Sequence, residues 1–189
     1  MLISDKSFKI KDLHYIIRSA VERDAESLSK LRLQIDGETE NLDREPGEAF
    51  IDPQGFQALI KADSESDRNL FLVAETDGRL IGFSRCAGTE LKRFRHKVEF
   101  GVGVLKEFWG YGVGKNLLQE SISWADENGI KKITLNVMES NENAKKLYEK
   151  LGFEVEGLLK DDKLLSDGKY YNMIVMGRLN NVDEGVRNE

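Results

Sequence analysis

A strand that runs into a glycine-rich turn and then into a helix is the feature that most limits the fold of this chain. Residues 99–118 read EFGVGVLKEFWGYGVGKNLL, with glycine at 110, 112 and 114 between an apolar strand and an amphipathic helix. Glycine lets main-chain N–H groups turn inward without Cβ clashes. The helix that begins near Val113 adds free N–H donors and the positive end of its dipole. The segment therefore predicts a binding site for a phosphate or diphosphate.

The spacing of the glycines does not fit the two common phosphate-binding fingerprints. A Walker A loop needs glycine five residues before Gly114 and Ser or Thr after the lysine, but the chain has Trp109 and Asn116 there. The dinucleotide fingerprint G-x-G-x-x-G, started at Gly110, needs glycine where the chain has Lys115. A nucleotide-binding domain is therefore disfavoured. For this turn alone, a tight strand-to-helix connection without a ligand remains the alternative.

A second informative segment, residues 141–153, reads NENAKKLYEKLGF. It predicts a helix over Asn141 to Leu151, with Ser140 as the N-cap and Gly152 as the C-terminal stop. Taken with the glycine turn, it resembles the GNAT superfamily of acyl-CoA N-acyltransferases. The family segment V-x-P-x-x-R/Q-x-x-G-x-G/A is similar to residues 104–114, and N-x-x-A-x-x-L-Y-x-x-x-G-F is similar to residues 141–153. The resemblance covers roughly residues 15–179.

Two positions depart from the GNAT pattern. Trp109 stands where the family usually has Arg or Gln, and Lys106 stands where it usually has proline. Tryptophan at the first position is familiar in the branch that resembles ribosomal-protein and polyamine acetyltransferases. Because the phosphate site relies on main-chain donors, phosphate binding is still expected.

Apolar periodicity predicts strands and helices in alternation. The expected strands cover residues 15–19, 70–76, 79–87, 97–104, 131–138, 153–159 and 169–179, and the expected helices cover residues 23–35, 53–62, 113–128 and 141–151. Gly37 is expected to end the first helix, and the acidic residues 36–48 are expected to form a loop. Asp77-Gly78 predicts a two-residue hairpin turn.

The strand, helix and strand over residues 97–138 form a crossover, so these two strands should be parallel. The predicted fold class is α/β, with a mixed, mostly antiparallel sheet. The GNAT resemblance adds that the two parallel central strands splay apart and are flanked by helices, and that the pantetheine arm enters the gap.

Length and composition predict one domain. A chain of 189 residues buries roughly 70% of its unfolded surface, enough for one core. We expect an N-terminal extension at residues 1–13, a single acyl-CoA N-acyltransferase domain at 14–179 and a polar tail at 180–189. The single Cys86 excludes an internal disulfide and is expected to be a buried small hydrophobe. No signal-type N-terminus is visible, so the cytoplasm is the expected location.

Charge limits the classes of partner. A net charge of −6 disfavours a nucleic-acid binder and suits a cationic amine substrate. No apolar run is long enough to predict a membrane partner. Two scattered histidines and one cysteine give no metal-ligand spacing, so no metal is expected.

The GNAT resemblance implies acetyl-CoA as the co-substrate and assigns a set of residues to it. The pantetheine arm is expected along the strand, the diphosphate on the glycine turn, and Asn141 beside either group. Asn141 could equally be a helix-start residue, and Lys115 could be a solvated lysine. The expected cofactor-binding residues are Val102, Gly103, Val104, Trp109, Gly110, Tyr111, Gly112, Val113, Gly114, Lys115 and Asn141.

Acetyl transfer to an amine needs a base, an oxyanion donor and an acid for the departing thiolate. Tyr148 matches the family tyrosine that serves as general acid, although the helical apolar stripe also fits a core tyrosine with a satisfied hydroxyl. Glu99 is the candidate base because it is the charged residue in a strand that reads as buried. A structural ion pair with Arg93 or Arg95, or docking of the amine, is the alternative.

The expected function is N-acetylation of a primary amine, either a small polyamine-like amine or a protein or peptide N-terminus. The alternative is a non-catalytic acyl-CoA-binding sensor or scaffold with the same fold. The acidic residues 36–48 could attract a cationic acceptor or be a solvated loop. A homodimer through the C-terminal strands is common among similar proteins, but nothing in the sequence requires it.

Overall fold

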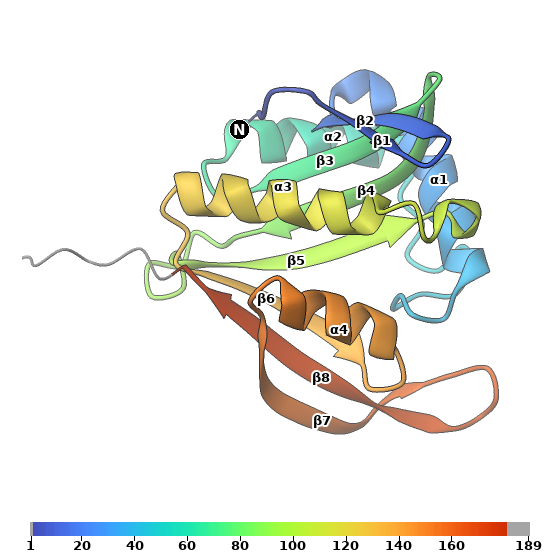
Figure 1. The fold of residues 1–189 in the computed structure, drawn as a ribbon, viewed down its shortest axis with the longest axis vertical. Coiled ribbons are helices and arrows are strands. Elements are labelled where there is room, and N and C mark those ends of the chain that lie inside the picture. The colour runs from blue at the N-terminus through green and yellow to red at the C-terminus, as the bar shows by residue number, and fades with distance from the viewer. Residues whose placement is uncertain (1, 181–189) are drawn as a thin grey trace, which may run out of the picture.

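The computed structural model describes residues 2–180 and has helices on both faces of an eight-stranded sheet (Figure 1). The predicted polar tail, apart from Asn180, lies outside the described residues. The elements in chain order are β1 (Lys6–Ile10), β2 (Leu13–Ser19), the 3-10 helix η1 (Glu22–Asp24), α1 (Ala25–Glu38), α2 (Pro53–Glu65), β3 (Leu70–Thr76), β4 (Arg79–Ala87), β5 (Lys97–Val104), the 3-10 helix η2 (Lys106–Phe108), α3 (Val113–Glu127), β6 (Lys132–Met138), α4 (Glu142–Lys150), β7 (Glu154–Leu164) and β8 (Tyr170–Leu179).

The strand order is β1-β2-β3-β4-β5-β6-β8-β7, and every neighbouring pair is antiparallel except β5 and β6. This confirms the mixed, mostly antiparallel sheet and the parallel central pair. The parallel register has three pairs, which are Lys97↔Lys132, Val98↔Ile133 and Glu99↔Thr134. Beyond Glu99 the two strands are not paired, so they part in the way that the GNAT resemblance implies.

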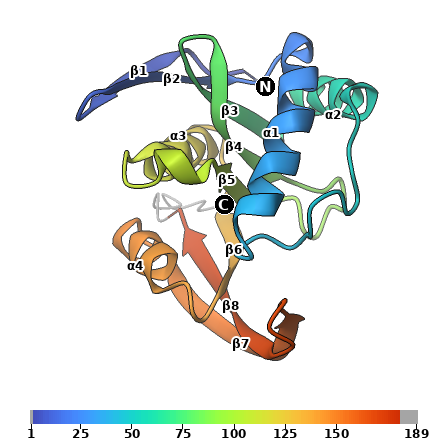
Figure 2. The same cartoon turned by 90° about the vertical axis from the view of Figure 1, so that its right-hand side faces the viewer.

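Each face of the sheet carries its own apolar core. Figure 2 shows α3 and α4 on one face and α1 and α2 on the other. Phe100 of β5 packs in the core that contains Leu117 of α3, whereas Val73 packs in the core that contains Ile35 of α1 and Phe56 of α2. Because side chains alternate along a strand, β5 presents Phe100 to α3 and its neighbour Glu99 to the opposite face. The described part of the chain contains no helix long and apolar enough to cross a membrane.

Several local predictions are confirmed to the residue. The hairpin of β3 and β4 turns at Asp77 and Gly78, whose φ angles of 48° and 77° fit a turn that needs positive φ at both central residues. Strand β5 has the predicted bounds. Cys86 is fully buried, and burial raises the pKa of its thiol to about 12, so it is a protonated core residue.

Other boundaries differ from the prediction. Gly37 does not end α1, which runs on to Glu38, because a glycine inside a helix costs only about 1 kcal/mol. The N-cap of α4 is Asn141, not Ser140, and its side chain accepts a hydrogen bond from the main-chain N–H of Ala144.

Two strands extend beyond the prediction. No strand was expected within residues 1–13, yet β1 lies there. Its residues pair with β2 from Leu13 to Ile17. Strand β7 runs to Leu164, and its register shifts between Leu159 and Lys163. The domain bounds at 14–179 stay a prediction.

Candidate active site

The glycine loop, defined here as residues 109–115, presents an open helix N-terminus. Gly110 and Gly112 have φ angles of 80° and 72°, which other residues adopt only with strain. Gly112 is the N-cap of α3 and gives no side-chain cap, and the first turn carries no acidic residue. The first helical bond runs from the N–H of Asn116 to the carbonyl oxygen of Gly112, at 2.9 Å. The main-chain N–H groups of residues 112–115, which come before this bond, have no partner within the helix and suit an anion.

Two of the predicted phosphate donors are already engaged. The N–H of Trp109 donates to the carbonyl oxygen of Lys106, and that of Tyr111 donates to the carbonyl oxygen of Phe108. The indole Nε1 of Trp109 also donates to the carbonyl oxygen of Val104, at 2.9 Å. Trp109 therefore ties the glycine loop to the end of β5, and the free donors lie in the first turn of α3.

The register of β5 decides which of its main-chain groups face the gap. The N–H of Leu105 donates to the carbonyl oxygen of Ile81 in β4. Because bonded and non-bonded pairs alternate in an antiparallel ladder, Gly103 points its main chain to β4. Val102 and Val104 point theirs to the side of β6, where the parallel pairing has ended. This register supports Val102 and Val104 as pantetheine contacts and does not support a main-chain contact from Gly103.

Tyr148 lies on α4, at the same face of the sheet as α3. Its side chain is buried, and its ring lies 5.9 Å from that of Phe153 between centroids. Burial raises the pKa of Tyr148 to about 12, so the hydroxyl is protonated at neutral pH. Within residues 2–180 no hydrogen bond joins this hydroxyl to another side chain or to the main chain. The hydroxyl therefore has no protein partner in this part of the chain, and the choice between an acid and a core tyrosine stays a prediction.

Glu99 is exposed, so the burial expected for this carboxylate was wrong. The reason is its position in the last parallel pair of β5 and β6, on the face opposite Phe100. Among the described residues it forms no ion pair, and the suggested pairs with Arg93 and Arg95 are absent. Glu99 therefore stands free where the two central strands part.

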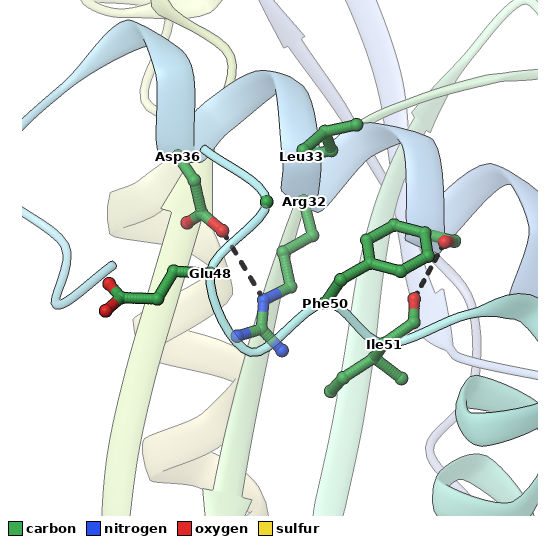
Figure 3. A pocket seen from close by; sticks show the side chains of 8 residues that line it. Arg32, Leu33, Asp36, Glu48, Phe50 and Ile51 are labelled. Carbon is green, nitrogen blue, oxygen red and sulfur yellow. Dashed lines mark hydrogen bonds and ion pairs between the residues drawn. The ribbon is translucent and has the colours of Figure 1, made fainter. Parts of the chain in front are cut away.

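A hollow lies beside the acidic residues 36–48. Figure 3 shows the hollow between α1 and residues 47–51, where Arg32 and Asp36 lie 3.7 Å apart. Burial raises the pKa of Asp36. Nearby, the hydroxyl of Ser29 donates to the carbonyl oxygen of Ile51, at 2.7 Å. The hollow contains none of the residues predicted for catalysis or cofactor binding.

Sequence reasoning missed a buried polar pair behind the glycine loop. The side-chain amide of Asn116 donates to the hydroxyl of Tyr15, at 2.7 Å. The alternation of Phe8 and Ile10 with polar residues was the available signal for β1, which pairs with the strand that carries Tyr15. No pattern in the sequence links positions so far apart.

Comparison with known proteins identifies the family. The model of the acetyltransferase (GNAT) family matches residues 36–153. The [ribosomal protein bS18]-alanine N-acetyltransferase of Haemophilus influenzae is 31% identical over 68% of this chain and 84% of its own length. The L-amino acid N-acetyltransferase AaaT of Escherichia coli is 33% identical over 57% of this chain and 67% of its own length.

Solved structures agree. A GNAT-family acetyltransferase from Streptococcus pneumoniae has a TM-score of 0.85 and 28% identity, covering 88% of this chain and 99% of that one. The yncA protein of Salmonella typhimurium, solved with its cofactor acetyl-CoA, shares the fold with a TM-score of 0.77 at 21% identity, covering 92% of this chain and 96% of that one. The chain therefore belongs to the GNAT family of N-acetyltransferases, whose typical co-substrate is acetyl-CoA.

Proposed function

We propose that the protein moves the acetyl group of acetyl-CoA directly onto a primary amine. The observation that carries the proposal is the open N-terminus of α3, tied by Trp109 to the end of β5 where that strand leaves β6. The N–H groups of Gly112, Val113, Gly114 and Lys115 suit the diphosphate, and Gly110 gives the loop its path. Asn141 is assigned to the helix cap, a role compatible with a contact to the pantetheine arm.

The chemistry is assigned to three groups of the chain. Acetyl-CoA supplies an activated acyl thioester. Glu99 takes a proton from the incoming ammonium, directly or through water, so that the nitrogen lone pair can attack the acyl carbon. The main-chain N–H of Val104 stabilises the negative charge on the acyl oxygen. Tyr148 gives its proton to the departing sulfur as the carbon–sulfur bond breaks.

The acceptor proposed is a cationic primary amine. By their names, the two relatives named above act on an alanine of ribosomal protein bS18 and on L-amino acids. A net charge of −6 favours a cationic acceptor by long-range attraction. Protein or peptide N-termini and small polyamine-like amines are therefore the two acceptor classes to test.

A thiol-release assay with an amine panel tests the proposal. Peptides with free N-termini, amino-acid esters, polyamines and aminoglycosides would each be incubated with the protein and acetyl-CoA. At least one class should release free CoA at a rate far above the protein-free control. A sensor with the same fold would bind CoA in calorimetry and release no thiol with any amine, and that result would replace the enzymatic proposal.

A further inference from the structure

The β1–β2 hairpin contacts the glycine loop through buried polar groups. The hydroxyl of Tyr15 accepts a hydrogen bond from Asn116 Nδ2 at 2.7 Å and donates to the main-chain carbonyl oxygen of Tyr111 at 3.4 Å. Tyr15 is 3% exposed and Asn116 is 7% exposed. One hydroxyl thus joins the hairpin to the loop and to the first full turn of α3.

Apolar and charged contacts strengthen the same junction. A Cβ atom at Gly112 would lie 2.7 Å from Ile10 Cδ1, so the hairpin packs directly against the loop main chain. Phe8 stacks on the ring of Tyr15 at 5.3 Å between centroids, and the ammonium of Lys11 lies 4.9 Å from the centre of the Tyr111 ring. The hairpin and its turn therefore cover the side of the loop that faces β1.

Trp109 ties the start of the loop to the end of β5, but the residues that follow include two glycines. Two glycines with positive φ within three residues leave the main chain with wide conformational freedom when unsupported. Ligand affinity falls when such a segment must be ordered on binding. The family match begins at residue 36, so the hairpin that supplies the support lies outside the matched residues.

We propose that the β1–β2 hairpin preorganises the glycine loop for coenzyme A, with Tyr15 and Asn116 as its positioning residues. They touch the loop main chain rather than the reacting atoms. This inference rests on the proposed binding of the diphosphate at the N-terminus of α3. It adds that affinity for the coenzyme depends on a hydrogen-bonded pair behind the loop.

Calorimetric titration with free CoA and thermal melting of the same samples test the inference. Tyr15→Phe should weaken binding about five- to tenfold, the effect of losing the hydrogen bond to the carbonyl oxygen of Tyr111, and should lower the melting temperature because Asn116 is left unpaired. In Tyr15→Phe/Asn116→Leu both polar partners are gone, so stability should recover. Affinity for CoA should stay low, because the carbonyl oxygen of Tyr111 is still untethered.

The control is Tyr171→Phe, which removes an exposed hydroxyl bonded to Asp167 on the β7–β8 hairpin and should leave the Kd unchanged. The double variant decides the matter even where a single variant folds poorly. A double variant that melts and binds CoA like the unaltered protein would overturn the positioning role. Failure of the unaltered protein to bind CoA would instead contradict the proposed function.

Discussion

Tyr148 is the residue whose chemistry depends most clearly on its surroundings. Its side chain is largely buried, and its hydroxyl has no hydrogen-bond partner among residues 2–180, so it is free to donate to a ligand. Tyr148→Phe should lower kcat at least about 100-fold, the smaller end of general-acid contributions, and leave the Kd for CoA within twofold. Steady-state kinetics and calorimetry check both parts. A kcat within threefold of the unaltered enzyme would contradict the acid role.

The same residue predicts a pH profile. An acid is lost only when the pH rises above its pKa, and burial raises the pKa of Tyr148 to about 12. We therefore expect no fall in kcat from this group between pH 8 and about pH 10, where an unperturbed tyrosine would begin to ionise. A descending limb near pH 10 that disappears in Tyr148→Phe would show that burial does not protect the proton.

Some site residues could be predicted from the sequence and others could not. Tyr148 and Gly112 were found because each sits in a local motif. The exposure of Glu99 could not be found, because it depends on where β6 leaves β5. The partnership of Tyr15 with Asn116 joins segments that only the folded sheet brings together.

At the scale of elements, the part of β7 that follows a bulge holds the acidic segment. Asp161 has a φ of 50°, and its N–H donates to Asn172 Oδ1 at 3.0 Å. Beyond this bulge, Lys163 Nζ donates to the carbonyl oxygens of Glu40 and Leu42 at 2.9 and 2.5 Å. The β7–β8 hairpin is thus joined to the segment that follows α1.

This junction predicts a change in protease sensitivity. Lys163→Met should speed trypsin cleavage after Arg44 about fivefold or more, because the loss of about 1 kcal/mol of hydrogen bonding raises the open population by that factor. Lys169→Met is the control, since that lysine is exposed and its ammonium pairs with nearby Asp167 within the described part of the chain. Mass spectrometry of the digest over time checks the rates. Equal cleavage rates in the two variants would show that Lys163 does not hold the segment.

Element boundaries were predictable where local signals agreed. The bounds of β5 and of the hairpin at Asp77-Gly78 follow from alternation and turn residues alone. The end of α1 and the length of β7 do not, because one glycine is only a weak helix stop and pairing with β8 outweighs the local signals.

At the scale of the whole molecule, the sheet separates the proposed acid and phosphate site from the proposed base. The glycine loop and Tyr148 belong to the face of α3 and α4, whereas Glu99 and the acidic segment belong to the face of α1 and α2 (Figure 2). The gap between β5 and β6 is the place where the two faces meet. The sequence could predict that β5 and β6 are parallel. It could not predict where they part, because that depends on how β5 pairs with β4 and β6 pairs with β8.

Coenzyme A is proposed to bind at the main chain of the glycine loop, and calorimetry of Gly112→Ala tests this binding site. The matched control is Gly168→Ala, because Gly168 has a similar φ of 75° but lies in the β7–β8 turn with nothing near its Cβ position. The unaltered protein and Gly168→Ala should bind CoA with equal affinity. Gly112→Ala should bind at least about tenfold more weakly, since a side chain disfavours the left-handed backbone and meets Ile10. Equal affinity in all three proteins, or no heat of binding from the unaltered protein at millimolar CoA, would contradict the account.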